Sequence, residues 1–107
     1  MTDRFEHGAF LENLGSTFYL VGGSEKIELE LFEVSELKKA RLQEMFSIVF
    51  RCRSGSVLPQ RTYRLEHEKM GRRDLLLVPI QKDDQWVYYE AVFNLLFKDS
   101  ESSGAAA

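Results

Sequence analysis

The chain has 107 residues, of which 44% are hydrophobic and 29% charged, and its formal net charge at pH 7 is −3. This length fits one domain around one core. No apolar run approaches the roughly 20 residues that span a bilayer, and the first residues lack the basic and then apolar pattern of a secretory signal. A lone cysteine fits a reducing compartment. We therefore expect a single-domain cytoplasmic protein that does not associate with membranes.

Charge is distributed unevenly along the chain. Roughly the first third carries two basic and eight acidic side chains, the middle third ten and three, and the last third two and six. A basic middle segment is typical of nucleic-acid binding, but these side chains are spread over several predicted strands and the sequence pI is about 5.4. The alternative is that Glu28 and Glu30 face Arg51 and Arg53 across neighbouring strands. We favour this pairing and expect no nucleic-acid partner.

The N-terminal residues predict a short helix over residues 4–14. Asp3 and Glu6 have the spacing of a capping box, and Gly15 suits the left-handed position that follows a helix. Because Gly8 lowers the intrinsic helix propensity, we expect this helix to be stabilised by docking against the sheet. Its predicted apolar face consists of Phe5, Ala9, Phe10, Leu11 and Leu14.

Apolar residues recur at every second position in much of the remaining chain, which is typical of β-strands. The breaks between these segments carry the turn residues Gly22–Ser24, Ser54–Ser56, Met70–Arg72 and Lys82–Gln85. The predicted strands are residues 17–21, 26–31, 46–53, 62–67, 75–80 and 86–97.

Several segments depart from this regular pattern. Phe32 breaks the alternation of the second predicted strand, which indicates a bulge or the end of the strand. Pro79 cannot donate a hydrogen bond within a sheet and therefore marks an edge or a bulge. Residues 35–45 are rich in helix-forming side chains and are predicted to be a short helix or an ordered loop. The domain is expected to span residues 1–98, and the polar residues 99–107 are expected to form a flexible tail.

Six strands with short connections and one short helix predict a mainly β fold. The expected strand order is an antiparallel meander, and a sheet this apolar needs closed edges or a covered second face. The sequence therefore predicts a small barrel or a barrel-like sandwich. Cys52 continues the apolar face of Phe46, Ile48 and Phe50, so we expect it to be buried and unreactive. The pattern leaves open whether the barrel encloses a ligand cavity.

His67 is the first candidate for catalysis because Glu66 and Glu68 flank it. Adjacent residues of a strand point to opposite faces, so neither glutamate can orient the imidazole as a catalytic pair requires. His7 has no second ligand at helical spacing, so the two histidines do not predict a metal site. The sequence thus predicts no catalytic, metal-binding or cofactor-binding residue, and a hydrolase that uses His67 is the weakest functional hypothesis.

The last predicted strand places Trp86 and Tyr88 on the face opposite to its core residues. Arg64 lies on the outer face of the fourth predicted strand and is expected nearby. Trp, Tyr and Arg are the residue types that dominate binding energy in protein interfaces. We therefore predict a protein-contact face of Trp86, Tyr88 and Arg64. The alternative is that the N-terminal helix or a loop covers the two rings.

Four segments carry a resemblance to a known family, namely Phe46–Arg51, Leu58–His67, Leu76–Ile80 and Tyr89–Asn94. In this order and spacing, and with the opening Phe10–Phe18, they resemble a family of small bacterial proteins catalogued only as a domain of unknown function. The resemblance implies a compact β-rich domain without assigned activity or catalytic residues, found near phage-tail-like or tail-collar-like proteins. The chain departs from the family's usual Gly-Pro with Cys52 and Arg53, and has Arg61 where Gly commonly follows Gln60.

These observations predict a non-enzymatic structural or protein-interaction module with an unidentified protein partner. Association with a phage-tail-like assembly is what the resemblance adds. The alternative is a small-ligand-binding β-barrel, which a cavity larger than about 300 Å³ with convergent polar groups would favour.

Overall fold

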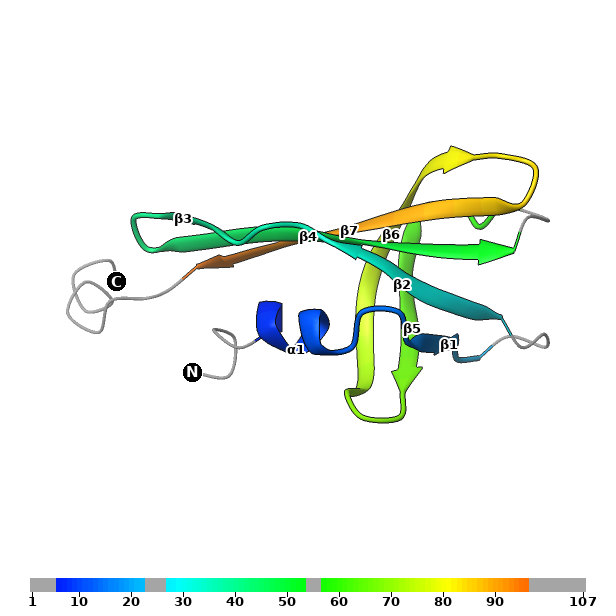
Figure 1. Ribbon diagram of the computed structural model, residues 1–107, viewed down its shortest axis with the longest axis horizontal. Helices are drawn as coiled ribbons and strands as arrows, with labels where there is room; N and C mark the ends of the chain where they lie inside the picture. The colour runs from blue at the N-terminus through cyan, green and yellow to red at the C-terminus, as the bar shows by residue number, and fades with distance from the viewer. Residues whose placement is uncertain (1–5, 23–26, 54–56, 97–107) are drawn as a thin grey trace.

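The computed structural model describes residues 6–22, 27–53 and 57–96. The predicted tail 99–107 lies outside these residues. No helix in the described ranges is long and apolar enough to cross a membrane. The described elements, drawn in Figure 1, are α1 (Glu6–Glu12), β1 (Thr17–Leu20), β2 (Glu28–Val34), β3 (Lys38–Ala40), β4 (Gln43–Arg53), β5 (Arg61–His67), β6 (Gly71–Lys82) and β7 (Trp86–Leu96).

Six of these strands close into an antiparallel barrel, which confirms the predicted fold class. Around the wall the order is β1, β2, β4, β7, β6 and β5, and β5 pairs again with β1. The additional strand β3 pairs with β4 outside this ring. Buried and more exposed residues alternate along much of β2, β4, β5 and β7, as a closed barrel requires.

The ring departs from a simple meander at one connection. After β4 the chain crosses to β5, which lies on the far side of the β1–β2 hairpin, and the consecutive strands β5, β6 and β7 then lead back to β4. The hairpin therefore lies between β4 and β5. Its two outer pairings join distant parts of the sequence, Tyr19 with Glu66 and Glu30 with Arg51.

Apolar side chains fill the inside of the barrel. Phe18 packs edge-on against Phe50, with 5.1 Å between the ring centroids. Within the described ranges no buried side-chain nitrogen or oxygen lacks a hydrogen-bond partner. The described interior is thus lined by apolar side chains and by polar groups that have hydrogen-bond partners. The other core residues are Phe10, Leu29, Leu31, Phe46, Ile48, Leu65, Leu75, Leu77, Val87, Tyr89 and Ala91.

Helix α1 contributes one of the most deeply buried residues of the core. Phe10 is fully inaccessible, and its ring lies 6.3, 6.2 and 5.2 Å from those of Phe18, Phe46 and Phe93. An ion pair between Glu6 and Arg73 of β6 adds a second link between helix and barrel. The docking expected from the weak helix propensity is therefore present.

The helix ends earlier than predicted and its buried face is narrower. Residues 4 and 5 of the predicted helix, which include Phe5 of its predicted apolar face, lie outside the described residues. The helix begins at Glu6 in the described part of the chain and ends at Glu12, and Gly15 has a φ of +90° as expected after a helix. Leu11 and Leu14 are 46% and 50% exposed, so the prediction that they belong to the apolar face was wrong. Turning the buried face toward Phe10 leaves them on the solvent side.

Both predicted irregularities are β-bulges. The register between β2 and β4 shifts between Leu31 and Glu33, so Phe32 is the extra residue. The register between β6 and β7 shifts between Pro79 and Gln81. A bulge leaves one residue outside the regular ladder, which accounts for the broken alternation at Phe32. In β6 the extra residue is Ile80, directly after Pro79, so the predicted irregularity lies beside the proline.

Most of residues 35–45 form a β-hairpin, so the prediction of a short helix or an ordered loop was wrong here. Lys38–Ala40 pair with Gln43–Met45, and Leu42 occupies the turn with a φ of +62°. The backbone and hydroxyl of Ser35 also hydrogen-bond the backbone of Ser47. If residues 38–40 formed a helix, the backbone N–H and C=O groups on this edge of β4 would have no partner strand. The hydrogen bonds gained by pairing with β4 outweigh the helix propensity of these side chains.

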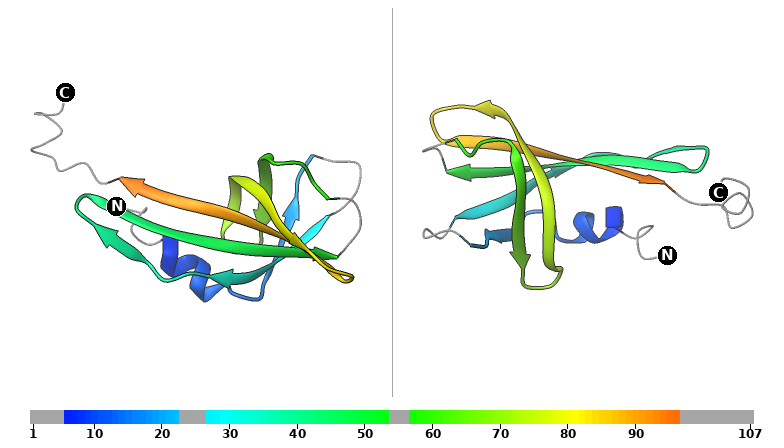
Figure 2. Two further views of the ribbon diagram at one scale, coloured as in Figure 1. Left: turned by 90° about the horizontal axis from the view of Figure 1, so that it is seen from above. Right: turned by 180° about the vertical axis from the view of Figure 1, so that it is seen from behind.

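Strands β4 and β7 pair along their whole length, from Gln43–Leu96 to Arg53–Trp86. Beside them β6 leaves β7 after Glu90. The part of the sheet beyond the ring is called the arm and consists of β3, residues 43–47 of β4 and residues 91–96 of β7. Figure 1 and Figure 2 show it extending past α1, which lies against one of its faces.

Candidate functional site

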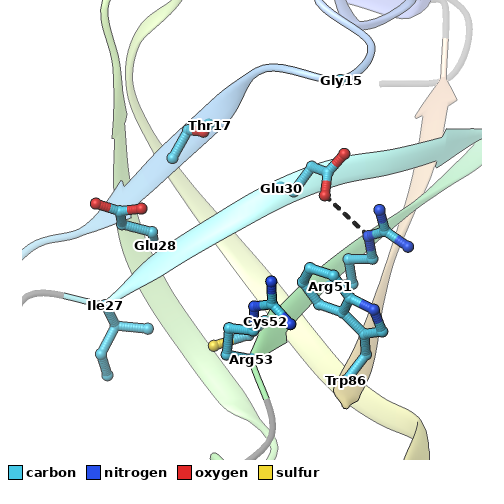
Figure 3. Close-up of a pocket in the computed structure, with 9 residues that line it drawn as sticks. All are labelled: Gly15, Thr17, Ile27, Glu28, Glu30, Arg51, Cys52, Arg53 and Trp86. Carbon is cyan, nitrogen blue, oxygen red and sulfur yellow. Dashed lines mark hydrogen bonds and ion pairs between the residues drawn. The ribbon is translucent and has the colours of Figure 1, made fainter.

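The outer wall of the barrel carries an arginine enclosed by aromatic rings. The Arg51 guanidinium carbon lies 4.0 Å from the ring centroid of Trp86 and 4.4 Å from that of Phe32. Arg51 Nε donates a hydrogen bond of 2.8 Å to a carboxylate oxygen of Glu30. Figure 3 shows Arg51 between Glu30 and Trp86. We call this set the Arg51 cluster; it comprises Glu30, Phe32, Arg51, Arg53, Trp86 and Tyr88.

Strand register brings the cluster together. Arg51 lies opposite Glu30 of β2 on one side and opposite Tyr88 of β7 on the other. Arg53 lies opposite Trp86, and its guanidinium carbon is 4.5 Å from the indole centroid. Opposite residues of antiparallel strands share a face, so these side chains all lie on the outer wall. The predicted pairing of Glu30 with Arg51 is confirmed, whereas the ladder between β2 and β4 does not include Glu28 and Arg53.

The bulge in β2 carries the third ring. Leu31 faces Phe50 inside the barrel and Glu33 faces Val49 outside it, so the extra residue between them joins the outer wall. Phe32 is 42% exposed, and its ring lies 5.5 Å from that of Tyr88. The bulge thus places two consecutive residues, Phe32 and Glu33, on the outer wall.

The turn between β6 and β7 fixes the start of β7. A carboxylate oxygen of Asp83 accepts hydrogen bonds from the backbone N–H groups of Gln85 and Trp86, at 2.8 and 2.7 Å. These bonds lower the pKa of Asp83 below its ordinary value. The hydrogen bond to Glu30 likewise stabilises the charged form of Arg51, and it therefore raises the pKa of Arg51. Asp83 therefore holds Trp86 in place, a role that the sequence analysis did not identify.

A cleft of about 440 Å³ lies beside the cluster. The pairing of β2 with β4 reaches no further than Glu30 and Arg51, and beyond this pair the two strands diverge (Figure 3). Glu28 lines the cleft from the β2 side, and Arg53 from the β4 side. The cleft is thus on the outside of the barrel and has an acidic and a basic wall.

Cys52 also lines this cleft, which corrects its predicted position. The thiol side chain is half-buried rather than buried. The reason is the divergence of β2 from β4, which removes the neighbour that would otherwise cover it. Partial burial raises the pKa of Cys52, so the reactive thiolate is disfavoured.

The predicted contact face is divided between two parts of the wall. Trp86 and Tyr88 lie in the Arg51 cluster and are half-buried. Arg64 instead pairs with Asp74 across β5 and β6, with 3.0 Å between Nε and the carboxylate. The structure does not place Arg64 with the two rings, because β6 separates β5 from β7. Sequence reasoning missed Phe32 and Arg51 as members, although the Glu30–Arg51 pairing was the signal that could have found them.

His67 is a buried structural residue. Its Nδ1 accepts hydrogen bonds from the backbone N–H groups of Lys69 and Met70, at 2.9 and 3.0 Å. The hydrogen of the neutral ring is therefore on Nε2, which donates to Ser16 Oγ at 2.8 Å. The hydroxyl of Ser16 in turn donates to the backbone oxygen of Asn13. In this tautomer His67 cannot accept the proton of Ser16, as a base that activates a nucleophile must.

We predict that His67 makes the free energy of unfolding depend on pH below about 6.5. Burial lowers the pKa of folded His67 below its ordinary 6.5, against a weaker opposing effect of Glu68. The unfolded chain then binds the proton first, so the free energy of unfolding is highest above pH 6.5 and decreases as pH falls toward the folded pKa. Urea unfolding of the wild type and of His67→Gln at pH 7.5 and 5.5 measures this effect. His7→Gln is the control. If the free energy of unfolding of His67→Gln depended on pH as strongly as that of the wild type, the prediction would be contradicted.

The other histidine is also engaged in the fold. His7 Nε2 donates to the backbone oxygen of Ser35 at 2.8 Å, and its ring packs edge-on against Phe46 at 5.0 Å. Among the residues that the structure describes, no three His, Cys, Asp or Glu side chains gather in a way that could hold a metal ion.

Comparisons with known proteins identify a family. No curated protein and no solved structure matches the chain. A family model described as Domain of unknown function (DUF6916) matches residues 5–93, which is most of the chain and includes the whole barrel up to the middle of β7. The chain therefore belongs to this family.

Proposed function

We propose that this domain is a non-enzymatic protein-interaction module and that the Arg51 cluster, with Trp86 and Tyr88, is its contact face. The observation that carries the proposal is the enclosure of Arg51 by Phe32 and Trp86 on the outer wall, at 4.4 and 4.0 Å. Trp, Tyr and Arg are the commonest energetic centres of protein interfaces. An arginine held in place by rings and by Glu30 loses little further freedom on binding.

The rings of the cluster are not needed to fill the core. Val87, Tyr89 and Ala91 are the inward residues of β7, and each is at most 2% exposed. Trp86 and Tyr88 alternate with them on the outer face. Large aromatic side chains that remain on a wall with a complete core behind it are typical of a binding surface.

A structural role for His67 supports the non-enzymatic part of the proposal. Both ring nitrogens are occupied by hydrogen bonds within the fold. A general base needs a free nitrogen within reach of the proton that it removes. The hydrolase hypothesis therefore has no support from this residue.

The second candidate function is small-ligand binding, which the cleft beside the cluster favours. Its volume of about 440 Å³ lies within the range of ligand sites, and Glu28 and Arg53 provide polar groups of both signs. A ligand would bind at the opening between β2 and β4, because the residues that line the cleft lie there. The association with a phage-tail-like assembly stays a proposal that rests on the family resemblance alone.

The contact face is tested by Trp86→Ala and Tyr88→Ala, with a partner recovered by affinity purification and then purified. Each substitution is expected to weaken binding by about 30-fold, which corresponds to about 2 kcal/mol, because hot-spot rings lose that much when truncated. The melting temperature is measured on the same samples.

The matched control is Leu76→Ala, which truncates a side chain that is 49% exposed on β6, outside the cluster. It should leave both quantities unchanged. A lower melting temperature in Trp86→Ala and Tyr88→Ala with unchanged partner binding would show that the rings serve the fold instead. Saturable binding of a small molecule that shifts the Glu28 and Arg53 amide resonances would favour the second candidate.

A further inference from the structure

The arm has an unpaired strand edge. Strand β7 pairs with β4 along its full length, but its ladder with β6 runs only from Val87 to Glu90. Among the residues that the structure describes, residues 91–96 therefore have a strand on one side and none on the other. In the left view of Figure 2 this part of β7 forms the outer edge of the arm.

This edge lacks the features that usually prevent strands from pairing with other molecules. Between Glu90 and Lys98 the sequence is Ala-Val-Phe-Asn-Leu-Leu-Phe, without charge, proline or glycine. Such a segment is typical of strands that add to another sheet. On this edge Val92 is 69% exposed, the most exposed large apolar side chain of the described residues.

The opposite edge of the arm is protected. Strand β3 carries the exposed residues Lys38 and Lys39. Lysines on an edge strand discourage the approach of a second sheet by charge and by the loss of their hydration. The two edges of the arm thus differ in charge: β3 carries lysines, and residues 91–96 of β7 carry no charge. We therefore expect a further strand to add at the β7 edge.

We propose that the β7 edges of two copies of this chain pair antiparallel and join the two arms into one continuous sheet. Two copies of an uncharged edge do not repel each other, so a second copy of this chain fits the edge. The edge offers no charge that would attract an acidic or a basic partner instead. Two identical strands related by a twofold axis are antiparallel, so one surface serves both copies.

The pleat of the strands restricts the register of this pairing. Opposite residues of an antiparallel pair must lie on the same face, so inward Phe93 must face an inward residue and outward Val92 an outward one. Inward and outward residues alternate along β7, so the two residue numbers of each pair must be both odd or both even. A twofold axis gives this pairing only when one residue of β7 lies opposite the same residue of the second copy. Val92 then lies next to apolar or amide side chains of the second copy, which removes its exposed surface from water.

The dimer is tested by sedimentation equilibrium over a range of concentrations, with wild type and Val92→Lys. The wild type should associate to a dimer, and Val92→Lys should raise the dissociation constant at least tenfold, because a lysine on an edge strand discourages pairing by its charge and its hydration. Leu76→Lys adds the same charge at an exposed apolar position of β6 and should leave the constant unchanged. Circular dichroism checks that both variants remain folded.

Hydrogen exchange gives a second readout that locates the contact. Amides within residues 91–96 should exchange more slowly as the wild-type concentration rises, and this change should vanish in Val92→Lys. A wild type that stays monomeric overturns the proposal. A dimer that survives Val92→Lys, or that protects other amides instead, also overturns it. This proposal is independent of the Arg51 cluster, because Trp86→Ala should leave the dimer intact.

Discussion

Replacing Phe10 by Ala is expected to lower the free energy of unfolding by about 3–5 kcal/mol, the usual range for removing a buried aromatic ring. Phe10 is fully inaccessible and touches three other rings, those of Phe18, Phe46 and Phe93. Its removal leaves a cavity between helix and sheet that these rings cannot fill, because strands hold them. Urea unfolding followed by circular dichroism measures the change.

The matched control for this experiment is the next residue of the same helix. Leu11 is 46% exposed, so Leu11→Ala is expected to change the free energy of unfolding by no more than about 0.5 kcal/mol. Similar values for the two variants would mean that α1 is a surface element whose docking adds little. That outcome would contradict the assignment of Phe10 to the core.

Replacing Tyr89 by Ala is expected to lower the free energy of unfolding by a similar amount, about 3–5 kcal/mol. Tyr89 is 1% exposed inside the barrel, and its hydroxyl oxygen accepts a hydrogen bond of 2.9 Å from the backbone N–H of Leu58. The ring fills the core, and the hydroxyl holds the segment that leads into β5. Burial also raises the pKa of Tyr89, consistent with a neutral phenol in this position.

Two further variants separate the ring of Tyr89 from its hydroxyl. Tyr89→Phe keeps the ring and leaves the N–H of Leu58 without its acceptor, so about 1–2 kcal/mol should be lost. Tyr63→Phe removes an exposed hydroxyl that donates to the backbone oxygen of Pro59 at 2.6 Å, and water should replace that bond with little change. A full loss in Tyr89→Phe would assign the effect to the hydrogen bond rather than to packing.

Local patterns in the sequence predicted the strands and their irregular positions. The alternation of apolar residues is a property of each strand alone, so it located the inward residues of β2, β4, β5 and β7 without knowledge of their neighbours. For β6 the predicted strand was too short, because Gly71 has no side chain and Arg72–Asp74 are charged, so these residues carry no apolar alternation. Those residues extend the strand through cross-strand ion pairs with β5, among them Arg72 with Glu66.

What the sequence could not supply is the order of strands around the barrel. Periodicity states which face a residue is on, but not which strand lies beside it. Arg64 and Trp86 were both correctly expected on outer faces, yet the crossing from β4 to β5 leaves β6 between their strands. The hairpin at residues 38–45 was missed for a related reason. Its stability comes from the edge of β4, whereas its own side chains favour a helix.

The position of the β1–β2 hairpin between β4 and β5 has a consequence for synthesis of the protein. The hairpin is translated before either strand that flanks it in the wall, and β5 follows only after the whole of β4. During translation its apolar residues, such as Phe18 and Leu29, therefore have no final neighbours. Closure must await the later strands, so the earliest residues of the barrel are the last to be enclosed, and chaperone binding is expected at this hairpin on the ribosome.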